Sequence, residues 1–156
     1  MQPGATKEPQ PGFTIREITT SDAEAAASLC AELGYSVTPA VMAERIRRLA
    51  NSPDHTVFVG CIGDRVVGWI DIGEVVRIQS ELAGEIGGFV VSDGFRSTGI
   101  GRQLLRRAEE WARERGIGKI VVRSQIKREA AHRFYLREGY QQVKTSHVFS
   151  KTLQTI

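Results

Sequence analysis

A six-residue stretch with two glycines constrains this chain more than any other feature: Arg96-Ser97-Thr98-Gly99-Ile100-Gly101. It follows the apolar run 89–91 and opens an amphipathic run over residues 100–115, which predicts a strand, a tight turn and a helix. The first N–H groups of a helix have no partner inside it, and the helix dipole favours negative charge there. Glycine lets a ligand approach the backbone closely. The turn is therefore a candidate phosphate or pyrophosphate site, with an ordinary strand-to-helix turn as the alternative.

Two common phosphate-binding motifs do not fit this turn. The dinucleotide fingerprint needs a third glycine, and Leu104 stands in that place. The P-loop needs a Gly-Lys pair followed by Ser or Thr, which the turn lacks.

A second segment, residues 131–140, reads Ala-His-Arg-Phe-Tyr-Leu-Arg-Glu-Gly-Tyr and predicts a short helix that ends at a glycine. The Arg-x-x-Gly-x-Gly turn, followed downstream by Ala-x-x-Phe-Tyr-x-x-x-Gly-Tyr, resembles the GNAT superfamily of acetyl-CoA-dependent N-acetyltransferases. The resemblance covers nearly the whole chain from Phe13 onward and is densest from Glu85 to Gly139.

The hydrophobic periodicity predicts an α/β three-layer domain with a central mixed, mostly antiparallel sheet of six to seven strands and about four helices. The resemblance implies that this domain is GNAT-like. Gly63-Asp64 predicts a hairpin turn, and residues 73–83 are expected to form strand ends and an exposed loop. Residues 1–12 are expected to be a flexible tail, and 13–156 a single domain. The predicted strands are 13–18, 56–62, 66–72, 85–91, 117–123 and one or more within 143–153; the predicted helices are 23–33, 39–50, 100–115 and 129–138.

Composition excludes several classes of protein. An apolar content of 41% and a charged content of 25% are ordinary for a soluble globular chain. No apolar run reaches the roughly 18 residues of a membrane span, and the tail lacks the apolar region of a signal peptide, so a cytoplasmic location is expected. Cys30 and Cys61 are expected to fill core space. His55 and His147 have no partner that the sequence identifies, so no metal site is expected.

Charge is distributed unevenly along the chain. Residues 96–137 carry twelve Arg or Lys against four Glu, whereas residues 1–95 carry seven Arg or Lys against thirteen Asp or Glu. A basic half suits a polyphosphate cofactor and an acidic half suits a cationic acceptor. The alternative is that most of these charges lie on solvated helix faces.

The resemblance implies acetyl-CoA as the acetyl donor co-substrate. It implies that the backbone of Phe89 and Val91 pairs with the pantetheine arm like an added strand. Arg128 stands where GNAT proteins often have an Asn, so the pantetheine contact that this Asn makes is in doubt here, and Arg128 or Lys127 is a candidate to reach a phosphate instead. The residues expected to surround the pyrophosphate are Arg96, Ser97, Thr98, Gly99, Ile100, Gly101 and Arg102.

Acetyl transfer to an amine needs a base and an acid. An alkylamine has a pKa of about 10.4, so it must lose a proton, and the departing thiolate gains one. The resemblance implies Tyr135 as the acid, with a packed aromatic side chain as the alternative. Glu85 is the candidate base, with an exposed strand residue as the alternative reading and Asp71 and Glu74 as other candidates. His132 is expected to be structural.

The resulting hypothesis is an enzyme that transfers acetyl from acetyl-CoA to the primary amine of a cationic small molecule, aminoglycoside-like or polyamine-like. Acetylation of a peptide or protein amine and a non-catalytic CoA-binding regulatory module are the alternatives. Nucleic acid is not an expected partner because the arginines lack interleaved aromatic residues, and no membrane partner is expected. The sequence leaves open the acceptor and whether a homodimer forms.

Overall fold

The computed structural model describes residues 11–156, so most of the predicted tail lies outside the described residues. The chain divides after Arg123 into two compact units, and residues 124–156 form the second. Within residues 11–156, no helix is both long enough and apolar enough to cross a membrane.

The first unit is built on a mixed sheet in which four antiparallel strands are followed by one parallel strand. The predicted sheet type is therefore confirmed, but the predicted six to seven strands are wrong, because the described residues form five. Residues 143–153 join no strand. Val143, Val148 and Phe149 are residue types that favour a strand, but a strand also needs a neighbouring strand to satisfy its backbone. The strands, in sheet order, are β1 (Phe13–Glu17), β2 (His55–Ile62), β3 (Arg65–Arg77), β4 (Ser80–Val91) and β5 (Ile120–Val122).

The β3–β4 hairpin is longer than the sequence suggested. Arg77 pairs with Ser80, so most of the segment 73–83, expected to hold a loop, continues the two strands. The β-branched residues Val75 and Val76 favour extended backbone, which explains the extra length. The pairing shifts between Asp71 and Ile72, which leaves Gly87 of β4 as an extra residue in a β-bulge.

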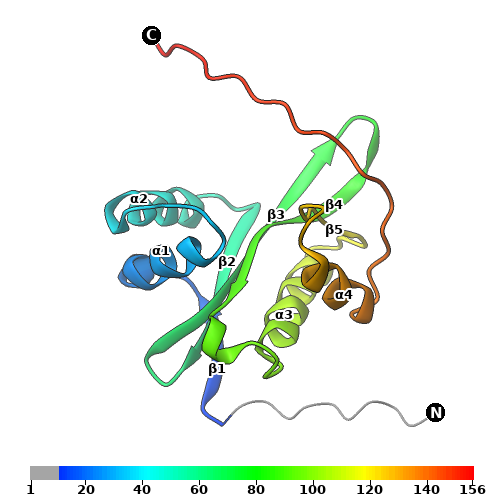
Figure 1. The fold of residues 1–156 in the computed structure, drawn as a ribbon. Helices are drawn as coiled ribbons and strands as arrows, with labels where there is room; N and C mark the ends of the chain where they lie inside the picture. Colours follow the sequence, from blue (N-terminus) through cyan, green and yellow to red (C-terminus); the bar gives the residue numbers. More distant parts are fainter. Residues whose placement is uncertain (1–10) are drawn as a thin grey trace, which may run out of the picture. The chain divides into compact units, whose positions relative to one another are not determined.

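Helices cover both faces of this sheet, which gives the predicted three layers (Figure 1). Helices α1 (Ala23–Glu32) and α2 (Pro39–Ala50) pack on one face, and α3 (Ile100–Glu114) packs on the other. Odd-numbered residues of β2, with Trp69 of β3, join α1 and α2 in one buried cluster. Phe58 points the other way, and Arg107 of α3 lies 4.4 Å from the centre of its ring. Cys30 and Cys61 are buried free thiols, as predicted.

The second unit contains α4 (Glu129–Arg137), and residues 138–156 lie in no helix or strand. Gly139 ends the helix with a φ of 91°, a left-handed conformation that glycine adopts readily. Its N–H donates to the carbonyl of Leu136 (3.2 Å), and the N–H of Tyr140 donates to that of Tyr135 (2.9 Å). This pair of hydrogen bonds is the Schellman arrangement, and with α4 the number of α-helices matches the predicted four.

Candidate functional site

The glycine turn has the predicted strand-to-helix geometry. After β4 ends, a short 3-10 helix, η2 (Asp93–Phe95), leads into the turn. Ser97 has a φ of 62° and Gly99 a φ of 89°, and Gly99 is the N-cap residue of α3. The first N–H groups of α3, those of Ile100 and Gly101, have no acceptor within the helix, as at any helix N-terminus.

Contacts within the protein brace this turn. The hydroxyl of Thr98 donates to the carbonyl of Phe95, and the N–H of Gln103 donates to the carbonyl of Gly99 at 3.2 Å. Arg96 forms an ion pair with Asp93 through Nη1 (2.6 Å) and donates from Nε to the carbonyl of Val91 at 3.2 Å. The turn is therefore shaped before any anion binds, and Arg96 contributes to that shape.

The strand that leads to the turn extends past its parallel neighbour. β4 pairs with β5 only over Gly84–Ile86. Phe89 and Val91, the residues predicted to contact a pantetheine arm, lie beyond that pairing and oppose Ile70 and Gly68 of β3. The sequence-predicted strand contacts and the glycine turn are thus brought together on one continuous segment.

Glu85 lies in the middle of the sheet, with Gly73 opposite on β3 and Val121 opposite on β5. Its side chain is 22% exposed. One carboxylate oxygen accepts from Nη2 of Arg77 and the other from Nε of Arg123, each at 3.1 Å. Both oxygens of the predicted base are therefore engaged by guanidinium groups.

Two polar side chains, those of His55 and Asp71, lie on the same face of the sheet as Glu85. His55 opposes Gly73, which opposes Glu85, so the three positions form one row across β2, β3 and β4. Asp71 is two residues before Gly73 and shares that face. The Nε2 atom of His55 is hydrogen-bonded to Oδ1 of Asp71, and their side chains are 29% and 25% exposed.

Sequence reasoning left His55 without a partner. The hairpin turn predicted at Gly63-Asp64 could have identified its partner, because the turn sets the register of β2 against β3. That register, with one irregularity at Gly60, places residue 55 diagonally opposite residue 71.

Glycines make room for the His55–Asp71 pair. A Cβ atom at Gly73 would lie 2.8 Å from Nδ1 of His55, and one at Gly87 would lie 3.3 Å from Oδ1 of Asp71. The imidazole ring therefore lies against bare backbone of β3, and the carboxylate lies over the β4 bulge. Two residues before Asp71 is Trp69, whose buried indole N–H has no hydrogen-bond partner within the described part of the chain.

Three further acids of the first half, Asp54, Glu74 and Glu81, are paired with basic groups. Arg115 donates to Glu74 at 3.0 Å and to Asp54 at 3.2 Å. Lys119 donates to Glu81 at 3.1 Å. The excess of acidic residues before position 96 therefore does not produce a free acidic surface at these positions.

A cavity of about 320 Å³ lies beside the start of β2. Its walls combine apolar residues of α2 with a stacked aromatic–cation pair, in which Arg115 lies 4.7 Å from the centre of the Trp111 ring. The cavity's lining includes Ile46, Leu49, His55, Val57, Trp111 and Arg115.

In the second unit, the C-terminal end of α4 positions Tyr135. Its ring contacts those of Phe134 and Tyr140, with centroids 5.5 and 5.7 Å apart. Burial raises the pKa of the Tyr135 phenol above its usual value, and the nearby charge of Arg128 acts in the opposite direction. The side chain of Arg128 is exposed at the N-cap of α4.

His132 has a structural contact in this unit. Its Nε2 lies 2.9 Å from the carbonyl of Gln125, which can only accept, so this nitrogen carries the proton. The contact ties the loop before α4 to the helix. In the range 11–156, no three His, Cys, Asp or Glu side chains gather in a way that could hold a metal ion.

Comparison with known proteins agrees with this geometry. The chain is 37% identical to an aminoalkylphosphonate N-acetyltransferase of Salmonella typhimurium, over 92% of this chain and 93% of that protein. It is 25% identical to an aminoglycoside N(6')-acetyltransferase type 1 of Stenotrophomonas maltophilia, over 90% and 94% of the two chains. Its fold matches the structure of AAC(6')-Iy, solved in complex with the bisubstrate analogue CoA-S-monomethyl-acetylneamine, with a TM-score of 0.79 at 14% identity, covering 90% of this chain and 99% of that one.

The family described as "Acetyltransferase (GNAT) family" matches residues 17–140, a range that contains both the glycine turn and Tyr135. The sequence motifs, the α/β fold and these similarities agree, and the chain belongs to the GNAT family of acetyl-CoA-dependent N-acetyltransferases.

Proposed function

We propose that this acetyltransferase transfers the acetyl group of acetyl-CoA directly to the primary amine of a small molecule. The observation that carries the proposal is the preformed turn at Gly99, which places the N-terminus of α3, a favourable site for an anion, shortly after the end of β4. The similarity to enzymes named for aminoalkylphosphonates and aminoglycosides supports a small-molecule acceptor. Acetylation of a peptide or protein amine is the alternative.

Two kinds of small amine are candidate acceptors. A cationic, aminoglycoside-like or polyamine-like acceptor is what the acid-rich first half suggested. The pairing of Glu85 with Arg77 and Arg123 favours a second candidate, an aminoalkylphosphonate, because guanidinium groups are good donors to phosphonate oxygens.

The proposed cofactor contacts lie on the segment that runs from the end of β4 through the glycine turn. We propose that backbone groups of Phe89 and Val91 bind the pantetheine arm and that residues 96–102 surround the pyrophosphate. Arg96 acts there partly by bracing the turn, because Nη1 and Nε already contact protein groups. The exposed Arg128 is a candidate phosphate contact from the second unit.

The chemistry needs one proton removed and one supplied. Acetyl-CoA supplies an acetyl thioester; the amine nitrogen bonds to its carbonyl carbon, and the carbon–sulfur bond breaks. We propose Tyr135 as the acid that protonates the departing sulfur. Burial raises the pKa of Tyr135, which keeps its phenol protonated at neutral pH and able to donate. Glu85, the base suggested by the sequence, and Asp71 are the two carboxylates proposed to take the amine proton.

A thiol-release assay tests the proposal. The protein is incubated with acetyl-CoA and a panel containing an aminoglycoside, a polyamine, an aminoalkylphosphonate and a short peptide. Release of CoA with a small amine supports the proposal, and release with the peptide alone favours the alternative acceptor. A thermal shift with CoA in the absence of amine tests cofactor binding separately. Binding of CoA with no thiol release from any amine would favour a regulatory module.

A further inference from the structure

We propose that Asp71, positioned by His55, is the carboxylate that accepts the proton from the amine, and that Glu85 has a different role. This inference rests on the proposed function, because it concerns the same transfer reaction. It is carried by contacts within the first unit alone.

Asp71 lies on β3 beside the bulge of β4. Its carboxylate lies over Gly87, the extra residue of the β4 bulge, with no side chain between them. The same strand continues through residues 89–91 to the glycine turn. A base on β3 opposite this bulge therefore faces the strand along which the proposed function places the thioester.

Glu85 and Asp71 differ in how their carboxylate oxygens are engaged. Each oxygen of Glu85 accepts a hydrogen bond from an arginine at 3.1 Å. Asp71 contacts His55 through Oδ1, and within residues 11–156 its Oδ2 has no hydrogen bond or ion pair. Asp71 therefore has an oxygen that can receive a proton from an amine or a water, whereas Glu85 is better placed to hold Arg77 and Arg123.

His55 contacts the carboxylate of Asp71 and orients it. With Nε2–H donating to Oδ1, the ring fixes the orientation of the carboxylate and leaves Oδ2 for the amine or for a bridging water. The ring is itself held against Gly73 and lines the cavity of about 320 Å³ beside β2, so it also has access to solvent. His55 is thus a positioning residue, comparable in logic to the orienting partner of a catalytic base.

The proposed transfer moves one proton from the amine to Asp71 and another from Tyr135 to sulfur. The amine's N–H bond breaks and its proton passes to Oδ2 of Asp71, directly or through one water, as nitrogen bonds to the acetyl carbon. The electron pair of the carbon–sulfur bond leaves with sulfur, which gains the proton from Tyr135. The carboxylate then releases its proton to solvent, and the Tyr135 phenolate takes up a proton from solvent, so both groups return to their starting states.

The test compares Asp71→Asn, His55→Gln and the double variant with wild type in the thiol-release assay, using the best amine of the panel. Matched controls are Asp64→Asn, an exposed acid of the β2–β3 turn, and His147→Gln, an exposed histidine of the second unit. We expect Asp71→Asn to lose at least about 100-fold in kcat, the scale of general-base catalysis, with little change in the KM for acetyl-CoA. His55→Gln should lose less, and the double variant should be no worse than Asp71→Asn.

Two further readouts separate a chemical role from a structural one. Asp71→Gly should regain kcat when formate is added, because a free carboxylate can occupy the vacated space, whereas a merely misfolded variant would not respond. CoA should raise the thermal midpoint of each variant as much as that of wild type. Retention of kcat by Asp71→Asn, or a formate response absent from a folded, CoA-binding Asp71→Gly, would overturn the inference. A wild-type protein inactive with every amine would instead contradict the proposed function.

Discussion

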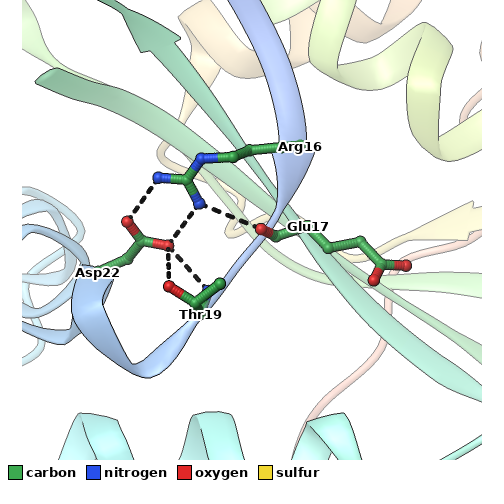
Figure 2. A network of polar contacts seen from close by, with 4 residues as sticks. All are labelled: Arg16, Glu17, Thr19 and Asp22. Carbon is green, nitrogen blue, oxygen red and sulfur yellow. Dashed lines mark hydrogen bonds and ion pairs between the residues drawn. The ribbon is translucent and has the colours of Figure 1, made fainter. Parts of the chain in front are cut away.

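Arg16 and Asp22 are joined by two hydrogen bonds, from Nη1 to Oδ2 at 2.7 Å and from Nη2 to Oδ1 at 2.8 Å (Figure 2). Within residues 11–156, Asp22 is the one buried charged side chain. Its Oδ2 also accepts from the N–H of Thr19 at 2.8 Å, at the start of the 3-10 helix η1 (Thr20–Asp22). One carboxylate thus ties the end of β1 to the beginning of α1.

This contact predicts an acid-sensitive stability. The hydrogen bonds from Arg16 hold the pKa of Asp22 below its usual value of about 4. Because the folded pKa is the lower one, the stabilisation is fully present above about pH 4 and is lost as the pH falls through the folded value. We expect Asp22→Asn to lower the free energy of unfolding by about 2 kcal/mol at neutral pH.

Urea denaturation at neutral and acidic pH measures this effect. The difference in the free energy of unfolding between Asp22→Asn and wild type should become smaller at acidic pH, where Asp22 itself becomes protonated. Glu17→Gln is the control, because the Glu17 side chain points away from the pair and only its carbonyl contacts Arg16 (Figure 2). A difference in unfolding free energy that does not change with pH would contradict a stabilising role for the ionised Asp22.

Gly99→Ala tests the phosphate turn. The φ of 89° at this N-cap is unfavourable for alanine by about 1 kcal/mol, so either stability falls or the turn changes shape. We expect CoA affinity, measured by calorimetry, to fall by about 10-fold or more, the factor that corresponds to about 1.4 kcal/mol. Gly94→Ala, in η2, is the control: its φ is not positive and a Cβ there meets no atom within 4 Å. Equal CoA affinity in both variants would argue against the proposed site.

Tyr135→Phe tests the proposed acid. The substitution keeps the ring that packs against Phe134 and Tyr140 and removes only the hydroxyl. We expect kcat to fall by about 100-fold with CoA affinity unchanged, because a general acid acts on the leaving thiolate and not on cofactor binding. Tyr140→Phe, the same change on the neighbouring ring, should keep full activity. Equal rates for the two variants would remove Tyr135 from the mechanism.

Local patterns in the sequence predicted the turns and helices, because the hydrogen bonds of these elements form between residues that are close in the sequence. The turn at Gly99 and the end of α4 at Gly139 were readable because glycine marks left-handed backbone, and α3 because its apolar residues recur with helical spacing. Residues 143–153 were misassigned because residue types that favour strands show that a strand is possible but not that a neighbouring strand pairs with it. The His55–Asp71 pair was missed for a related reason, since a cross-strand contact depends on register and bulges, which no local pattern records.

Glu85→Gln separates the two candidate carboxylates. If Glu85 mainly holds Arg77 and Arg123, the amide should lower kcat by less than about 10-fold, below the range of a lost general base, and should raise the KM for the amine. Steady-state kinetics beside Asp71→Asn gives the comparison. A loss in kcat from Glu85→Gln that exceeds the loss from Asp71→Asn would restore Glu85 as the base.

Gly73→Ala disturbs the His55–Asp71 pair without changing either residue. A Cβ at position 73 would lie 2.8 Å from Nδ1 of His55, so the ring must move away from the sheet and its hydrogen bond to Asp71 must lengthen or break. The backbone at this position is ordinary strand, so alanine itself brings no backbone strain. We therefore expect Gly73→Ala to reproduce the kcat loss of His55→Gln, and combining the two changes to add little. Gly118→Ala, where a Cβ meets no atom within 4 Å, is the control and should keep wild-type kinetics. Full activity in a folded Gly73→Ala protein would show that acetyl transfer does not depend on where the imidazole of His55 lies.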